Sequence, residues 1–130
     1  MSRDLIHLIS LNAQGLREPC KRQRVLQWIN YQKANVVYLQ ETHYTSDLEL
    51  SVSTEFSSWH CYHAYGTSNS RGVTILINKN LASDIDYVVK DKYGRYLFLN
   101  LTIGSDNMTL LHIYAHNDRQ LRNKQFDRLT

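Results

Sequence analysis

The sequence predicts an α/β fold, because short apolar segments of strand length flank a segment with helical spacing. Residues 5–11 and 36–39 are apolar runs rich in Ile, Leu and Val, which is typical of buried strands. The segment between them starts at Glu18-Pro19 and repeats apolar residues at helical intervals. This strand–helix–strand order indicates a βαβ unit, so we expect its two strands to pair in parallel.

The helix has clear start signals and one apolar face. Proline suits the first turn of a helix, and an acidic residue there complements the positive end of the helix dipole. Val25, Trp28 and Ile29 follow at i, i+3, i+4 spacing, so we expect all three to pack inward. A basic group near the start is expected to stay solvated, or alternatively to hold DNA phosphates: Lys21, Arg22 and Arg24.

The second half of the chain predicts antiparallel strands joined by turns. The aromatic segment 59–65 precedes a loop of Ser, Asn and Gly at 66–72, and we expect it to pair with the strand after that loop. From Asp118 the spacing again indicates a helix. The strands expected in this half are 73–77, 87–89, 96–103 and 108–114, with turns at 91–94 and 104–107.

Composition limits the range of functions. A chain of 130 residues fits one domain, 1–130, and 42% hydrophobic with 21% charged residues is typical of a globular protein. The net charge of +3 is compatible with a polyanionic partner without requiring one. Cys20 and Cys61 lack metal-ligand spacing, which indicates free thiols in a reducing compartment, the nucleus or cytoplasm. We expect neither a signal peptide nor a membrane span.

Three polar side chains stand at strand ends and are candidates for a site. Asn12 ends the first strand, Glu41 follows the second and Tyr114 ends the last. Parallel pairing would place Asn12 and Glu41 at one sheet edge, where α/β proteins form their sites. One carboxylate beside an amide oxygen suits Mg²⁺ better than Zn²⁺, and a tyrosine hydroxyl can donate to a phosphate oxygen.

Each candidate also has an ordinary structural explanation. Asn12 beside Gly15 suits a turn, Glu41 suits a solvated loop, and Tyr114 suits a packed ring with its hydroxyl at the surface. The histidines show no ligand spacing on a helix, so we expect them to be exposed or hydrogen-bonded: His43, His60, His63, His112 and His116.

Five segments carry a family resemblance: ISLNAQGL, KRQRVLQWI, VVYLQETH, RGVTILI and LLHIYAHN, in this order. Together they resemble the endonuclease domain of LINE-type (L1-like) non-LTR retrotransposons, within the endonuclease/exonuclease/phosphatase superfamily that includes apurinic-site endonucleases. Sphingomyelinases and inositol phosphatases share the superfamily fold, but the LNAQGL and QETH motifs favour the retrotransposon branch. The resemblance implies a four-layer α/β sandwich, of which this chain would form the incomplete N-terminal half.

The resemblance also implies residue roles and chemistry. Asn12 corresponds to an asparagine that organises the metal and phosphate site, and Glu41 to the metal-binding glutamate. Tyr114 corresponds to a tyrosine that contacts the scissile phosphate, and Asn117 to an asparagine near that phosphate. The implied reaction is hydrolysis of DNA phosphodiester bonds with Mg²⁺ or Mn²⁺ and no small-molecule cofactor. His116 stands where the family has proline, which would loosen the loop that holds Asn117.

The resemblance implies later motifs that these residues do not contain. A GDFN motif and a serine-aspartate-histidine motif would complete the catalytic machinery, and neither occurs in the sequence. We therefore expect the chain alone to be inactive. The alternative is a non-catalytic half-domain that binds nucleic acid or pairs with another chain. Because the missing half would supply the other sheet, we also expect uncovered apolar surface, open strand edges and self-association.

Overall fold

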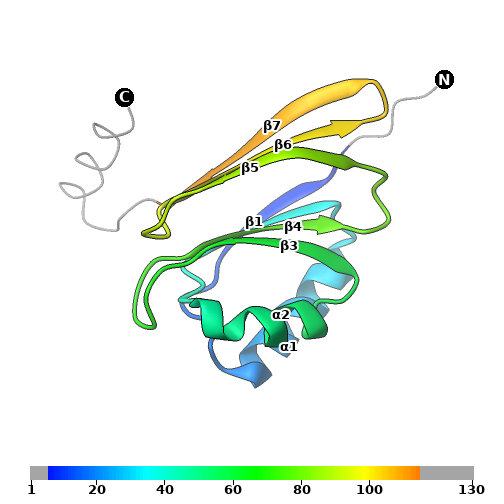
Figure 1. Ribbon diagram of the computed structural model, residues 1–130. Helices are drawn as coiled ribbons and strands as arrows, with labels where there is room; N and C mark the ends of the chain where they lie inside the picture. Colours follow the sequence, from blue (N-terminus) through cyan, green and yellow to red (C-terminus); the bar gives the residue numbers. More distant parts are fainter. Residues whose placement is uncertain (1–5, 115–130) are drawn as a thin grey trace.

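Three layers make up residues 6–114, the part of the chain that the computed structural model describes: helices, a four-stranded sheet and a three-stranded sheet (Figure 1). The elements follow in the order β1 (Leu8–Asn12), α1 (Pro19–Gln32), β2 (Val36–Gln40), the 3₁₀ turn η1 (Ser46–Leu48), α2 (Glu49–Glu55), β3 (Trp59–Ala64), β4 (Val73–Asn78), β5 (Asp84–Lys90), β6 (Tyr96–Ile103) and β7 (Asp106–Ile113).

The four-stranded sheet has the order β1-β2-β4-β3 and lies between the other two layers. β1 and β2 pair in parallel, as the sequence predicts, and Asn12 lies opposite Gln40. β4 pairs antiparallel with β2 and with β3, which confirms the expected pairing across the loop at 66–72. Leu76 on β4 packs toward the helices, whereas Ile75 and Ile77 belong to the core between the sheets. This alternation explains why β4 is apolar at nearly every position.

The three-stranded sheet is an antiparallel meander of β5, β6 and β7. The expectation that a missing half supplies the other sheet is therefore wrong, because residues 84–113 form a second sheet themselves. Leu97, Leu99 and Leu101 alternate along β6 and are fully buried. An apolar strand face has to be buried against another layer, and here the four-stranded sheet provides that layer.

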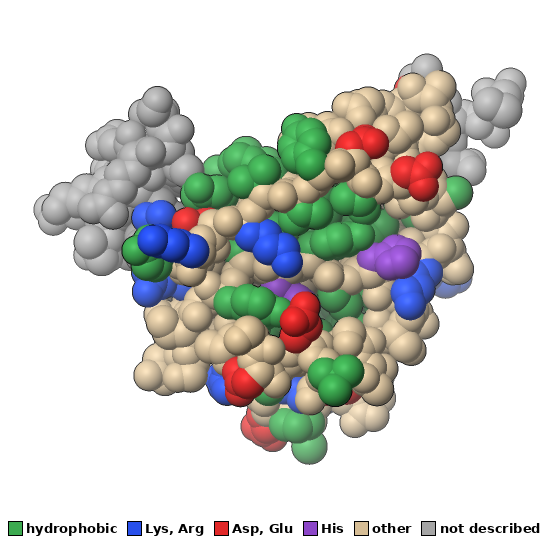
Figure 2. Space-filling view, viewed as in Figure 1, with side chains coloured by type: hydrophobic (Ala, Val, Ile, Leu, Met, Phe, Trp, Pro, Cys, Tyr) green, Lys and Arg blue, Asp and Glu red, His purple; other side chains and the backbone are tan. Residues whose placement is uncertain are grey.

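The outer face of the second sheet carries exposed apolar side chains. Tyr87, Val89 and Leu111 keep 53%, 41% and 46% of their surface accessible. Val89 and Leu111 both lie opposite Phe98 of β6, one on each side. Figure 2 shows hydrophobic side chains gathered in the region of this sheet. Uncovered apolar surface is thus present as expected, while self-association stays a prediction.

The helical layer corrects two expectations about α1. Ile29 is fully buried, but Trp28 keeps 40% of its surface exposed and does not pack inward. Arg22 was expected to be solvated and is only 3% exposed, because it forms an ion pair with Glu55 at the end of α2. No helix among residues 6–114 is long and apolar enough to cross a membrane.

Element boundaries differ from the sequence prediction mainly where pairing extends a strand. β1 begins at Leu8 and includes Asn12, because Asn12 still pairs with β2. β5 is longer than the predicted 87–89, and β7 begins two residues before the predicted 108–114. β7 ends at Ile113, so Tyr114 directly follows the strand. The helix expected from Asp118 lies outside the described residues.

Candidate active site

Parallel pairing brings Asn12 and the loop that holds Glu41 to the same edge of the four-stranded sheet. The register continues past the strand ends, because the Ala13 amide donates to the Gln40 carbonyl at 2.8 Å. The Gly15 amide then donates to the Glu41 carbonyl at 2.7 Å. The turn after β1 is thereby held against the loop after β2, as parallel pairing of the two strands predicts.

Tyr114 reaches this edge from the second sheet. Its hydroxyl lies close enough to the Glu41 carboxylate for the two groups to interact electrostatically, and only 7% of the residue is exposed. Burial raises the pKa of the phenol, and the nearby Glu41 carboxylate raises it further, while the Arg71 charge opposes them. The phenol therefore stays protonated and acts as a hydrogen-bond donor beside a carboxylate. The structure thus brings together Glu41 and Tyr114, two residues 73 positions apart.

Arg71 is a member of this cluster to which the sequence analysis assigned no role. It lies directly before Gly72 and β4, in the quoted segment RGVTILI. β4 runs antiparallel to β2, so its first residues lie at the same edge as the end of β2. The sequence does place a basic residue immediately before a strand. This points to the site only when the antiparallel pairing of β4 with β2 is known.

The backbone around the cluster adopts unusual conformations. Glu41, His43 and Arg71 have φ values of 57°, 58° and 62°, in the left-handed region. Such φ values cost roughly 1–2 kcal/mol per non-glycine residue, so surrounding contacts must hold them. The His43 amide donates to the Arg71 carbonyl at 2.9 Å, and the Thr42 amide donates to the Gly72 carbonyl at 3.1 Å. Strained residues concentrated at one edge indicate a functional site.

Gly72 is required where the two loops meet. Its φ is +90°, and a Cβ there would lie 2.6 Å from the Thr42 hydroxyl oxygen. The Gly72 amide in turn donates to the Gly94 carbonyl at 3.1 Å, and the Tyr114 amide donates to the Arg95 carbonyl at 2.6 Å. These bonds join the turn at 91–95 to the same edge.

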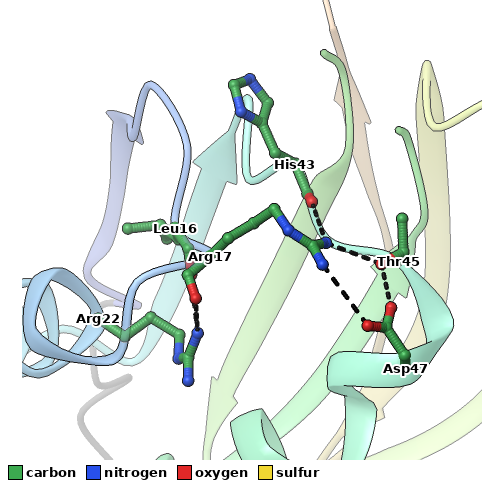
Figure 3. A network of polar contacts seen from close by, with 6 residues as sticks. All are labelled: Leu16, Arg17, Arg22, His43, Thr45 and Asp47. Atoms are coloured by element: carbon green, nitrogen blue, oxygen red, sulfur yellow. Dashed lines mark hydrogen bonds and ion pairs between the residues drawn. The ribbon is translucent and has the colours of Figure 1, made fainter. Parts of the chain in front are cut away.

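Two arginines support the site loops from below (Figure 3). Arg17 donates to the His43 carbonyl at 3.1 Å and to the Thr45 hydroxyl at 2.8 Å, and it pairs with Asp47 at 3.5 Å. Arg22 donates from Nη1 to the Leu16 carbonyl at 3.1 Å and to the Arg17 carbonyl at 2.7 Å. Arg17 thus connects the loop after β1 to the loop after β2, and Arg22 ties the loop after β1 to α1.

The remaining predicted site residues have different outcomes. Asn12 is exposed, and its side-chain oxygen accepts from the Gln14 amide at 3.2 Å, so it performs the turn role expected of an asparagine here. Asn117 and His116 lie outside the described residues. The metal and phosphate roles of Asn12, Glu41, Tyr114 and Asn117 remain predictions.

The buried histidines are hydrogen-bonded, as expected. The Nδ1 atom of His63 lies 2.7 Å from the Thr74 hydroxyl, and Nε2 of His112 lies 2.9 Å from the Leu39 carbonyl. Burial lowers the pKa of His63 to about 4 and also lowers the pKa of His112. Within residues 6–114, no three His, Cys, Asp or Glu side chains form a metal-binding group.

The side chains at the edge fit a magnesium-type ion rather than zinc. Glu41 supplies one carboxylate and Asn12 one amide oxygen, whereas the thiols of Cys20 and Cys61 are free and lie elsewhere. Mg²⁺ is held by one or two protein carboxylates and keeps several waters, while structural zinc sites need four protein ligands. These donor types are those that Mg²⁺ uses, and a metal ion at this edge stays a prediction.

Comparison with known proteins places this arrangement in a family. The transposon TX1 uncharacterized 149 kDa protein of Xenopus laevis is 26% identical over 125 residues, which cover 96% of this chain and 10% of that protein. A humanized D. rerio TDP2 matches with a TM-score of 0.72 at 18% identity, covering 95% of this chain and 57% of that one. D. rerio TDP2 complexed with a single-strand DNA product gives 0.67 at 17% identity, with 95% and 52% covered.

An AP endonuclease from Archaeoglobus fulgidus matches with a TM-score of 0.68 at 16% identity, covering 96% of this chain and 49% of that one. The chain thus spans about half the length of these solved structures. Residues 9–129 match the Endonuclease/Exonuclease/phosphatase family. The predicted resemblance to a transposon-borne nuclease domain is confirmed at this level, and the chain belongs to the endonuclease/exonuclease/phosphatase family.

Proposed function

We propose that this chain carries the metal- and phosphate-binding part of a site that hydrolyses DNA phosphodiester bonds. The observation that carries the proposal is the placement of the buried Tyr114 phenol close to the Glu41 carboxylate, at the sheet edge where β1 also ends. Burial and strained backbone hold the two groups together, and the family contains nucleases. One of the solved relatives is named as a complex with DNA, which supports DNA as the substrate class.

The residues divide the work by their chemistry. Glu41 would hold Mg²⁺ or Mn²⁺, with the Asn12 amide beside it. When bound, such an ion polarises a phosphoryl oxygen and stabilises the charge that develops on it. The Tyr114 phenol stays protonated at neutral pH, so it can donate to an anionic oxygen beside Glu41. No group that could act as a general base is assigned among the described residues.

We propose further that these 130 residues bind metal and DNA without cleaving DNA on their own. The sequence lacks the GDFN and serine-aspartate-histidine motifs that the resemblance implies for activation of water and for catalysis. It also spans only 57% or less of the solved structures compared above. Positioned catalytic groups act as a unit, so removal of part of the unit loses most of the rate.

The test combines metal binding, DNA binding and nicking on the same preparations. We expect Mn²⁺ to bind the wild-type chain and not Glu41→Ala, measured by loss of the free Mn²⁺ electron spin resonance signal. Glu18→Ala serves as a control, because Glu18 is an exposed acid at the start of α1. Supercoiled plasmid with Mg²⁺ should show no nicking above the Glu41→Ala background.

Two results would contradict parts of this proposal. Mg²⁺-dependent nicking that disappears in Glu41→Ala would confirm the phosphodiesterase site but refute the inactivity of this chain. Equal Mn²⁺ binding by the wild type and Glu41→Ala would refute the metal role of Glu41. A chain that binds neither metal nor DNA would overturn the site as a whole.

A second candidate function is pairing with another chain through the second sheet. The exposed side chains of Tyr87, Val89 and Leu111 favour it, because apolar residues gathered on one sheet face form association surfaces. Sedimentation equilibrium should then show a dimer that Leu111→Lys dissociates. A monomer at all concentrations would leave this candidate without support.

A further inference from the structure

Arg71 lies at the candidate site, and its side chain differs from those of the other arginines within residues 6–114. Arg17, Arg22 and Arg95 each form an ion pair with a carboxylate, and Arg24 is exposed to solvent on α1. Arg71 forms none within residues 6–114, and its Nε is buried without a hydrogen-bond partner there. A buried guanidinium N–H without an acceptor is costly, so it indicates a ligand that supplies the acceptor.

The position of Arg71 is fixed by the backbone rather than by its own side chain. Its φ of 62° lies in the left-handed region, and its carbonyl accepts from the His43 amide at 2.9 Å. A non-glycine residue in this conformation costs free energy that a glycine would avoid. The chain thus keeps an arginine at a position whose backbone favours glycine, although the side chain forms no ion pair there.

The neighbours of Arg71 define what ligand fits. Its charge acts on the Tyr114 hydroxyl, which lies close to the Glu41 carboxylate. An anion at this edge would meet a cation and a phenolic donor, both next to the predicted metal ligand. Guanidinium groups match phosphate oxygens with two parallel N–H bonds, so a phosphodiester is the anion that this set suits.

We propose that Arg71 binds a backbone phosphate of the nucleic acid at this site through its guanidinium group. The inference rests on the proposed function and adds a specific substrate contact to it. Arg71 requires no metal for this contact. Its role can therefore be measured in the presence of a chelator, where hydrolysis and metal binding make no contribution.

The experiment measures binding of a short fluorescent DNA duplex by anisotropy in EDTA, over a series of salt concentrations. Arg71→Gly removes the guanidinium and relieves the left-handed backbone, so it should fold at least as well as the wild type. Lys79→Ala is the matched control, because Lys79 is exposed after the far end of β4. Both variants lose one positive charge.

We expect Arg71→Gly to weaken binding about tenfold at low salt and to reduce the slope of log K against log salt by about one. Arg71→Lys should retain the slope and lose part of the affinity, because a lysine keeps the charge without the fork. Lys79→Ala should change neither quantity appreciably. Glu41→Ala should bind at least as tightly in EDTA, because it removes a negative charge from the site.

Three results would overturn the proposal. Arg71→Gly could bind DNA as tightly as the wild type, or Lys79→Ala could lose as much affinity as Arg71→Gly. The wild-type chain could also fail to bind the duplex at low salt. Failure of the proposed hydrolysis is separate, because it is measured with Mg²⁺ and depends on Glu41. A loss of duplex binding confined to Arg71→Gly would support the phosphate contact even if no nicking is seen.

Discussion

Replacement of Arg22 by alanine should destabilise the fold strongly, although the sequence alone predicts that Arg22 is solvated. The side chain is 3% exposed and uses most of its donors. Its Nε lies 2.8 Å from a Glu55 oxygen, and Nη2 lies 2.7 Å from the same carboxylate. Nη1 reaches the carbonyls of Leu16 and Arg17 at 3.1 Å and 2.7 Å.

The cost can be estimated from these bonds. Two carbonyls lose a charged donor, which costs about 1.5 kcal/mol each at the lower end of the range for such bonds. The Glu55 side chain is 33% exposed and can regain water, so loss of the ion pair adds only about 0.5–1 kcal/mol. The sum is roughly 3.5–4 kcal/mol, a large part of the ~5–15 kcal/mol that holds a typical domain together.

Urea unfolding followed by tryptophan fluorescence measures this loss, with Arg24→Ala as the control. Arg24 is an exposed residue on the same helix, so its replacement should change the free energy of unfolding by less than about 0.5 kcal/mol. Glu55→Gln should lie between the two variants, because it keeps one acceptor for Arg22. If Arg22→Ala costs no more than Arg24→Ala, the bonds to the Leu16 and Arg17 carbonyls do not stabilise the fold.

Three further predictions concern the core, the strained loop and pH. Ile29→Ala should lower the free energy of unfolding in urea by about 3 kcal/mol, and Trp28→Ala by under about 1 kcal/mol, because only Ile29 is fully buried. Equal losses for the two variants would place Trp28 in the core. Glu41 and Lys33 have φ values of 57° and 55°, which glycine adopts more easily than alanine. Glu41→Gly should therefore be about 1 kcal/mol more stable than Glu41→Ala, and Lys33→Gly should exceed Lys33→Ala by a similar amount. Equal melting temperatures within each pair would mean that these loops are not strained. His63 is neutral in the fold with a pKa of about 4, against about 6.5 when unfolded. The unfolded chain therefore binds the extra proton, and stability should fall by up to about 3 kcal/mol from pH 6.5 to 4. His63→Gln should flatten this dependence and exposed His60→Gln should not, in urea titrations across that range.

The elements that the sequence predicts well are those whose signals are local. β6 matches the predicted 96–103 in full, since its buried leucines alternate with less buried residues. α1 begins at Pro19, as its start signal indicates. The common edge of Asn12 and Glu41 also follows from the chain order alone, because a strand–helix–strand unit imposes parallel pairing.

The elements that the sequence does not predict depend on contacts between distant segments. α2 has no side-chain cap hydrogen bond, and its apolar signal is limited to Leu48, Val52 and Phe56 at four-residue intervals. Without α2 the partner of Arg22 is unknown, so the prediction that Arg22 is solvated was wrong. The contact of Tyr114 with Glu41 depends on how the two sheets stack, which the bond from His112 to the Leu39 carbonyl fixes at 2.9 Å.

The arginines near the site loops have two different expected roles, one in stability and one in DNA binding. Arg17 donates to the carbonyl of His43, whose φ is 58°, and Arg22 donates to the carbonyls of Leu16 and Arg17, so both hold the site loops in place. Their loss should remove stability and DNA binding together, because both depend on the loop positions. Arg71 forms no ion pair among residues 6–114, and its backbone would be easier for glycine. Replacement of Arg71 should therefore reduce DNA binding while the free energy of unfolding stays equal or rises. A residue whose replacement weakens binding without lowering stability acts on the ligand and not on the fold.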